Sequence, residues 1–384
     1  MRGTSHADRH GHWTGGICLL LPGWQTPAGA AEQTTPPAET IGPADRTQLH
    51  HSTVTVMSGT VHDGNTTIVQ NIAAALDDGE AFRVIPMVGQ GPAQTLRDVM
   101  SLRGVDMGIT QSTVLNHFAR TGELGPIREQ VVYVAKLFNE DLHLLARSEI
   151  ADIAALNGKT VNIGLKSSGT EIAARFLFAT LGVHVRETHL DAAEAVEKIK
   201  SGDIDATVLI GTTPSPRIAE VGRDSGLKLL GIPFAQGLED DTYPATLAHD
   251  DYPALIDRGE RVDTIAVCAV LVAFRDPQDG SRQDRLKRFV DRFFSKFDAL
   301  QEPPSHPKWG EVNFAATLED WQRAPQAQAW IDNAKTQALS AVQEKERFRT
   351  FLAQTGKDRT SEDEHETLFR AFKAWSERQA QASN

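Results

Sequence analysis

The sequence has little cysteine, no long hydrophobic run and no excess of positive charge. Its 384 residues include two cysteines, Cys18 and Cys268, which excludes a disulfide framework and a metal site built from several cysteines. No run of about 18 apolar residues occurs, so no segment is predicted to span a bilayer. Acidic residues outnumber basic ones by 51 to 39, a net charge of −12. We therefore expect neither a nucleic-acid partner nor direct membrane insertion of the mature chain.

Motifs of common enzyme classes are also missing. The stretch from Gly164 to Glu171 has the two glycines of a phosphate-binding P-loop, but Thr170 and Glu171 stand where that motif requires Lys and Ser or Thr. No Gly-x-Ser-x-Gly elbow is present, so a hydrolase nucleophile is not indicated. The histidines are scattered or terminal and lack the spacing of metal ligands. We expect no catalytic residue, no cofactor and no bound metal.

What is present is an alternation of β-rich runs and helical patterns, in a chain 40% hydrophobic and long enough for about two domains. Such alternation predicts parallel sheets covered by helices, an α/β fold with two lobes. The polar stretch Asn139–Asp141 is read as a turn between two strands. The strands are expected over Thr53–Met57, Phe82–Val88, Val105–Thr110, Val131–Phe138, Leu142–Arg147, Thr160–Gly164, Asp205–Ile210 and Thr264–Phe274.

The first fifty residues differ from the body of the chain. Arg2 and Arg9, the apolar run Ile17–Leu21 and the small residues Ala28-Gly29-Ala30 are typical of an export signal. The alternative is a tail that stays in the cytoplasm. We expect a signal peptide over residues 1–30, a linker over 31–50, a first lobe over 51–147 and 264–300, a second lobe over 148–263, and a helical C-terminal extension over 301–384.

The C-terminal region is predicted to be helical. Arg282–Leu300 has the period of an amphipathic helix, and Leu318–Leu352 and Ser361–Gln379 are further helical segments, the first broken or kinked at Pro325. Four of the six tryptophans lie here: Trp309, Trp321, Trp330 and Trp375. They are expected to dock the extension onto the body, although a partner surface is the alternative.

Three loops each follow a strand and precede a helix: Ser58–Asn65, which contains His62, Gly89–Gln94, and Lys166–Thr170. Ligands bind at such loops in open α/β sheets, and helix N-termini there present free N–H groups that suit a carboxylate or phosphate. The alternative is that the small residues only form turns and caps. Ser112 is also expected to cap a helix.

Two other groups are assigned plainer roles. The acidic run Glu239–Asp241 lacks the spacing of a calcium loop and is expected to be solvated surface. Cys268 lies within an apolar run and is expected to be a buried, inert thiol.

The order of these loops resembles the TAXI-type solute receptors of tripartite ATP-independent periplasmic (TRAP) transporters. The matching stretches cover about residues 52 to 275 and are Met57-Ser58-Gly59-Thr60, Gly89-Gln90-Gly91, Val105 to Ser112, Leu156 to Gly164, and Ser168-Gly169-Thr170. The resemblance implies a two-lobed periplasmic binding protein fold, type II-like. It implies ligand contacts from Ser58, Thr60, Gln111, Ser168 and Thr170, with Gly59 and Gly169 where the ligand approaches the backbone closely. His62 and Thr212 lie in loops that depart from the family pattern, and they complete the expected ligand contacts; none of these residues is expected to be catalytic.

The function implied by the resemblance is capture of a small organic acid in the periplasm and its delivery to a TRAP membrane permease. Closure is expected about strands near Leu144–Arg147 and Thr264–Ala269. Two alternatives stay open. One is the receptor of an ATP-driven importer, which shares the fold. The other is an enzyme on the same fold that carries a covalent cofactor on an exposed, activated Cys268.

Overall fold

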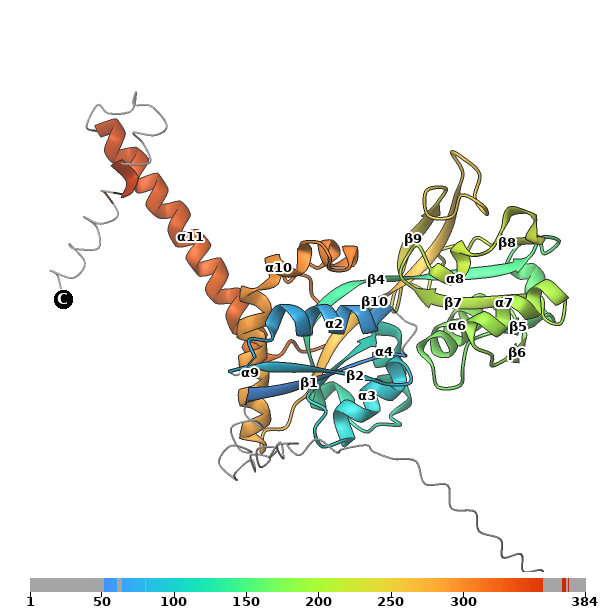
Figure 1. Ribbon diagram of the computed structural model, residues 1–384, viewed down its shortest axis with the longest axis horizontal. Coiled ribbons are helices and arrows are strands. Elements are labelled where there is room, and N and C mark those ends of the chain that lie inside the picture. The colour runs from blue at the N-terminus through green and yellow to red at the C-terminus, as the bar shows by residue number, and fades with distance from the viewer. Residues whose placement is uncertain (1–51, 61–63, 80, 355–367, 371, 373–384) are drawn as a thin grey trace, which may run out of the picture. The chain divides into compact units, whose positions relative to one another are not determined.

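The computed structural model describes residues 52–60, 64–79, 81–354, 368–370 and 372. The expected signal peptide and linker, His62, and all but four residues of the helix expected over Ser361–Gln379 therefore lie outside the described residues. The expected α/β class is confirmed, and within the expected C-terminal extension residues 325–354 form a helix (Figure 1).

The core of the described chain is one mixed sheet, in which the strand order is β2-β1-β3-β10-β4-β7-β5-β6, with β8 on β4 and β9 on β10. Pairing is parallel among β1, β2 and β3 and among β5, β6 and β7, and antiparallel where β4 and β10 take part. The strands are β1 (Thr53–Ser58), β2 (Arg83–Val88), β3 (Met107–Gln111), β4 (Val131–Arg147), β5 (Thr160–Asn162), β6 (Arg186–Thr188), β7 (Ala206–Gly211), β8 (Leu227–Leu229), β9 (Tyr243–Ala248) and β10 (Arg261–Phe274).

Helices follow the strands in both halves of the sheet. They are α2 (Gly64–Leu76), α3 (Pro92–Ser101), α4 (Ser112–Thr121), α5 (Ile127–Gln130), α6 (Gly169–Thr180), α7 (Ala192–Ser201), α8 (Pro216–Ala219), α9 (Gly280–Ser295), α10 (Phe297–Gln301) and α11 (Pro325–Gln354), with 3₁₀ turns η1 (Ala154–Leu156), η2 (Arg223–Ser225) and η3 (Pro307–Glu311). We call β1–β3 with α2–α4 the first lobe, and β5–β9 with α6 and α7 the second.

Local sequence explains where several helices begin and end. Pro92 is the first residue of α3, where its missing N–H costs no hydrogen bond. Asp191 caps α7 by accepting from the Glu194 N–H at 2.9 Å, and Gly202 ends that helix in the left-handed conformation with φ 81°. By contrast, Ser112 is the first residue of α4 and makes no cap bond there, which contradicts the expected role.

The two lobes are joined by the long strands β4 and β10, which run through both (Figure 1). The expected turn at Asn139–Asp141 is wrong, because β4 continues unbroken for 17 residues. At Asp141 its partner changes from β10 to β7. β10 pairs with β9 up to Ala266 and with β3 from Ala269 onward. The crossover on β4 is thus at Asp141, and the expected position Leu144–Arg147 lies inside the second lobe.

The C-terminal residues pack on the first lobe through aromatic side chains, as expected. Trp309 is fully buried, and its indole donates to the Asn71 side chain of α2 at 3.2 Å. Its ring lies 6.0 Å from that of Phe293 on α9. Pro325 is the first residue of α11, so it does not break a longer helix. The residues from Leu318 up to Pro325 were expected to be helical and are not. Among the described residues, no helix is both long and apolar enough to cross a membrane.

Candidate functional site

The N-termini of helices from both lobes come together beside the crossover strands. A Cβ placed on Gly169, the first residue of α6, would lie 1.9 Å from Gln111 Oε1 and 3.2 Å from Pro92 Cγ. A Cβ on Gly91, just before α3, would lie 4.0 Å from the Ser168 Cα. Gln111 immediately precedes α4. Segments that are distant in sequence therefore form one inter-lobe contact made of helix starts.

A second inter-lobe contact lies beside the first residue of α2. A Cβ on Gly64 would approach the Thr212 side chain to 3.2 Å. Thr212 follows β7 and is half-buried. Of the expected site residues, Gln111, Ser168, Gly169 and Thr212 thus take part in contacts between the lobes.

The loop after β1 uses its polar groups within the first lobe. Ser58 is 1% exposed, and its hydroxyl lies 3.1 Å from the Thr66 hydroxyl. Thr66 Oγ1 in turn donates to the Thr60 carbonyl at 2.8 Å. The Gly59 carbonyl accepts from a backbone N–H of the next loop at 2.9 Å. The structure therefore gives these residues a loop-shaping role and does not bring the Ser58 hydroxyl to the second lobe.

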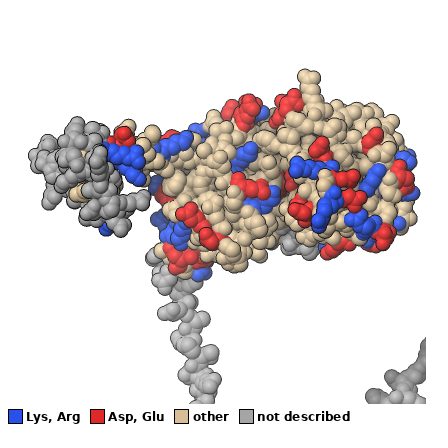
Figure 2. Space-filling view, turned by 90° about the horizontal axis from the view of Figure 1, so that it is seen from above, with Lys and Arg blue, Asp and Glu red and all other residues tan. Residues whose placement is uncertain are grey.

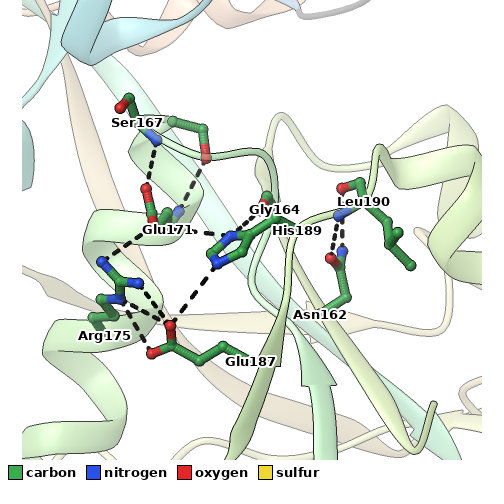
Figure 3. A network of polar contacts seen from close by, with 9 residues as sticks. Asn162, Gly164, Ser167, Glu171, Arg175, Glu187, His189 and Leu190 are labelled. Atoms are coloured by element: carbon green, nitrogen blue, oxygen red, sulfur yellow. Dashed lines mark hydrogen bonds and ion pairs between the residues drawn. The ribbon is translucent and has the colours of Figure 1, made fainter.

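Charged side chains of α6 and β6 hold the loop before α6 in place (Figure 3). Ser167 has φ 60°, and its N–H donates to the Glu171 carboxylate. Arg175 bridges Glu171 at 3.1 Å and Glu187 at 2.6 Å. The hydrogen bond from Arg175 holds the pKa of Glu187 below its usual range. Ser168 caps α6 by accepting from the Glu171 N–H at 3.1 Å.

This arrangement leaves donors at the start of α6. The N–H groups of Gly169 and Thr170 have no partner within the helix, because the first turn of any α-helix lacks acceptors for them. The Ser168 hydroxyl uses an oxygen lone pair for the cap, and its proton can still donate. Thr170 is half-buried beside Gly164. The start of α6 therefore carries N–H donors that the helix leaves unpaired, and Gly169 within it lies against Gln111 and Pro92 of the first lobe.

Sequence reasoning missed the buried carboxylate of Glu140, which is 4% exposed. Its two oxygens accept from Asn65 Nδ2 at 2.8 Å and from Gln111 Nε2 at 2.6 Å. Asn65 lies in the first turn of α2, so the carboxylate joins two of the converging helix starts to the crossover strand. The available signal was the lack of Gly or Pro anywhere in residues 131–147, which disfavours a turn inside that run.

A second polar group lies on the adjacent residues of β4. Thr213 donates to Asp141 Oδ2 at 2.5 Å, and the Tyr252 hydroxyl lies 2.7 Å from His143 Nε2. Burial lowers the pKa of His143 to about 4, and it raises the pKa of Asp141. Burial also raises the pKa of Tyr252 to about 12. These groups tie the crossover to the loop after β7 and to the second lobe.

The acidic run Glu239–Asp241 is not simply solvated surface, because Asp241 is 3% exposed. Its carboxylate accepts from Arg120 Nη1 at 3.1 Å and Nη2 at 2.7 Å, and from Asn116 Nδ2 at 2.6 Å. Both partners lie on α4 of the first lobe, and Asp241 precedes β9 of the second. The bidentate ion pair fastens the lobes together, which local sequence did not indicate.

The chemistry required for the enzyme alternative is not supported. Cys268 is fully buried, and burial raises the pKa of its thiol to about 12. The expectation of an inert thiol is confirmed, since a reactive cysteine needs exposure and a lowered pKa. No cluster of metal-ligating side chains occurs in the part of the chain that the structure describes. Acidic and basic side chains are interspersed over the face shown in Figure 2.

Comparison with known proteins gives one family match. The model of the NMT1-like family matches residues 66–313, which includes the crossover strands, the second lobe, and the first lobe apart from β1 and the start of α2. Solved structures with a similar fold include MatC from Rhodopseudomonas palustris with bound malate, at 16% identity, covering 65% of this chain and 86% of that one, with a TM-score of 0.43. The periplasmic aliphatic sulphonate binding protein SsuA from Escherichia coli matches at 15% identity, covering 73% and 83%, with a TM-score of 0.38. A TctC solute binding protein from Polaromonas matches at 15% identity, covering 65% and 87%, with a TM-score of 0.39.

Proposed function

The chain belongs to the NMT1-like family, and from that premise we propose that it is an extracytoplasmic solute-binding receptor that performs no reaction on its ligand. The fold is the two-lobed α/β fold of periplasmic binding proteins. Such a protein binds its solute between lobes that close about the strands joining them. In this chain those strands are β4 and β10. The lobes are proposed to comprise residues 51–147 with 264–300, and residues 148–263, except that residues 142–147 pair with β7 and β8 and so belong with the second lobe.

The observation that carries the proposal is the meeting of helix starts between the lobes. Gln111, beside the N-terminus of α4, lies directly against Gly169 at the N-terminus of α6. Ser168, Gly169 and Thr170 supply donors at this helix start. A helix N-terminus favours an anionic group through its unpaired N–H donors and its dipole. We therefore assign a carboxylate-bearing small molecule to this site, with Thr212 at its edge.

The finer assignment is a TAXI-type receptor that delivers an organic acid to a TRAP permease in the periplasm. It rests on the loop stretches Met57–Thr60, Gly89–Gly91 and Ser168–Thr170 and on their order along the chain. Export requires removal of about residues 1–30. Ser58, Gly59, Thr60 and His62 belong to the same proposal as the first-lobe loop at this site.

The ligand is tested on protein purified from the periplasm of a Gram-negative host. Native mass spectrometry is expected to show a co-purified small acid, and calorimetry with that acid is expected to give one site per chain. Intact-mass measurement is expected to show loss of about 30 N-terminal residues. The proposal would be contradicted if no small acid bound to the protein, or if the chain were absent from the periplasm.

The transporter class is tested by uptake. Cells that carry the receptor with a TRAP permease are expected to lose uptake when the ion gradient is collapsed with an ionophore while ATP is maintained. The receptor of an ATP-driven importer would give the reverse dependence. The matched control is a strain with the same permease and no receptor.

A further inference from the structure

The side chains around Glu140 carry a specificity that the helix N-termini alone do not. Asn65 and Gln111 are 3% and 4% exposed, so both amides are withdrawn from water. Each amide group donates to one oxygen of Glu140. In the same two side chains, Asn65 Oδ1 and Gln111 Oε1 are buried without a hydrogen-bond partner.

Glu140 determines which way these two amides point. A carboxylate accepts hydrogen bonds, so the NH₂ end of each amide must turn toward it. The carbonyl ends are then forced to point away from Glu140. Gln111 Oε1 as a result lies against Gly169, at the start of α6 in the second lobe. Both acceptors thus have a direction set by Glu140, and one of them, Gln111 Oε1, lies beside the donors at the start of α6.

Buried acceptors without donors are costly, and a site that contains them selects a molecule that supplies the missing hydrogen atoms. From this we infer, on the basis of the proposed function, that the ligand is a carboxylate that also bears an N–H or O–H donor group, as 2-amino and 2-hydroxy acids do. The donor group binds Asn65 Oδ1 or Gln111 Oε1, and the carboxylate binds the N–H groups of α6. A matched 2-oxo acid, which has only acceptors at that carbon, is rejected.

In this account Glu140 is a positioning residue, because it acts through the two amides. Replacing Glu140 with Gln supplies an NH₂ group that can donate to an amide oxygen, so at least one of the two amides is free to reverse. The reversed amide presents a donor to the ligand. The variant is therefore expected to lose selectivity without losing the carboxylate subsite at α6.

The experiment uses sets of three acids with the same carbon skeleton, bearing a 2-amino, 2-hydroxy or 2-oxo group, with three to six carbons. Calorimetry on the mature wild-type protein is expected to find a skeleton for which a donor-bearing member binds at least tenfold more tightly than the oxo acid. Comparison of the amino and hydroxy members distinguishes an ammonium from a hydroxyl. In Glu140→Gln the preference over the oxo acid is expected to fall at least fivefold.

Asp141→Asn is the matched control, since Asp141 is the next residue of β4 and hydrogen-bonds Thr213, not the two amides. It is expected to keep the wild-type preference. If Glu140→Gln does not fold, Gln111→Met supplies the same readout, because it removes one acceptor with little change in volume. A preference for the oxo acid, or a preference unchanged in Glu140→Gln and in Gln111→Met, would overturn the inference while leaving the proposed function intact. If no acid of any set binds, the proposed function fails and the inference falls with it.

Discussion

Replacing Gly169 with Ala is expected to weaken ligand binding while leaving the fold intact. The added Cβ would lie 1.9 Å from Gln111 Oε1, so the two residues must separate until this distance is at least about 3.0 Å. Gln111 cannot yield freely, because its Nε2 is bound to the buried Glu140 at 2.6 Å. Either that charge-assisted bond is broken or the lobes stay apart.

The magnitude follows from the bond that is at risk. A hydrogen bond to a charged group contributes about 1.5–3 kcal/mol, so the affinity for the ligand is expected to fall roughly tenfold to one hundredfold. Folding is not expected to suffer. Gly169 does not have a positive φ, and Ala is favoured over Gly in helices by up to about 1 kcal/mol.

Calorimetry with the co-purified ligand measures the affinity, and thermal unfolding without ligand measures stability. Gly280→Ala is the matched control, since Gly280 is likewise the first residue of a helix, α9, and its Cβ would meet nothing within 4 Å. The control is expected to bind normally. An unchanged affinity in Gly169→Ala would refute the argument that ligand binding requires this inter-lobe contact.

Three further predictions concern other parts of the structure. Replacing Ser168 and Thr170 together by Ala is expected to weaken binding at least about tenfold and to cost about 1 kcal/mol of stability for the lost cap; equal affinity in calorimetry would make them turn formers only. Arg120→Met leaves the buried Asp241 carboxylate without its ion pair and is expected to cost about 1–2 kcal/mol in urea unfolding, less than a fully buried pair because Arg120 is half-exposed. Adding Asp241→Asn is expected to recover part of that loss, and a purely additive loss would contradict the pairing. Folding lowers the pKa of His143 from 6.5 to about 4, so between pH 6.5 and pH 4 this imidazole is protonated in the unfolded chain and neutral in the folded one. The free energy of unfolding is therefore expected to fall by about 3 kcal/mol as the pH decreases from 7 to 4. Urea unfolding of His143→Gln over the same pH range is expected to lack this part of the loss, and an identical pH profile would be inconsistent with a buried neutral imidazole.

Local patterns in the sequence were enough to predict much of the fold. The strand, loop and helix around Ser168 depend on neighbouring residues, and the expected order of these elements is confirmed. The burial of Cys268 followed from the apolar run that contains it. The α/β class could be predicted because helical and strand periodicity also depend on residues close together in the sequence.

What could not be predicted depends on contacts between distant residues. Asn139–Asp141 are polar and were interpreted as a turn, yet they lie inside β4. The buried Glu140 carboxylate accepts a hydrogen bond from Asn65, which is 75 positions away in the chain. The buried Asp241 carboxylate is paired with Arg120, which lies 121 positions earlier in the chain. Polar residues in a strand that passes between two lobes are stabilised by partners that no local pattern reveals.

The central claim is that a small acid binds between the two lobes at the start of α6. A crystal structure of the mature protein with its co-purified ligand tests this most directly. We expect ligand density beside the contact of Gln111 with Gly169, with the ligand carboxylate hydrogen-bonded to N–H or hydroxyl groups of residues 168–170. Ligand density elsewhere, with this inter-lobe contact unchanged, would contradict the account.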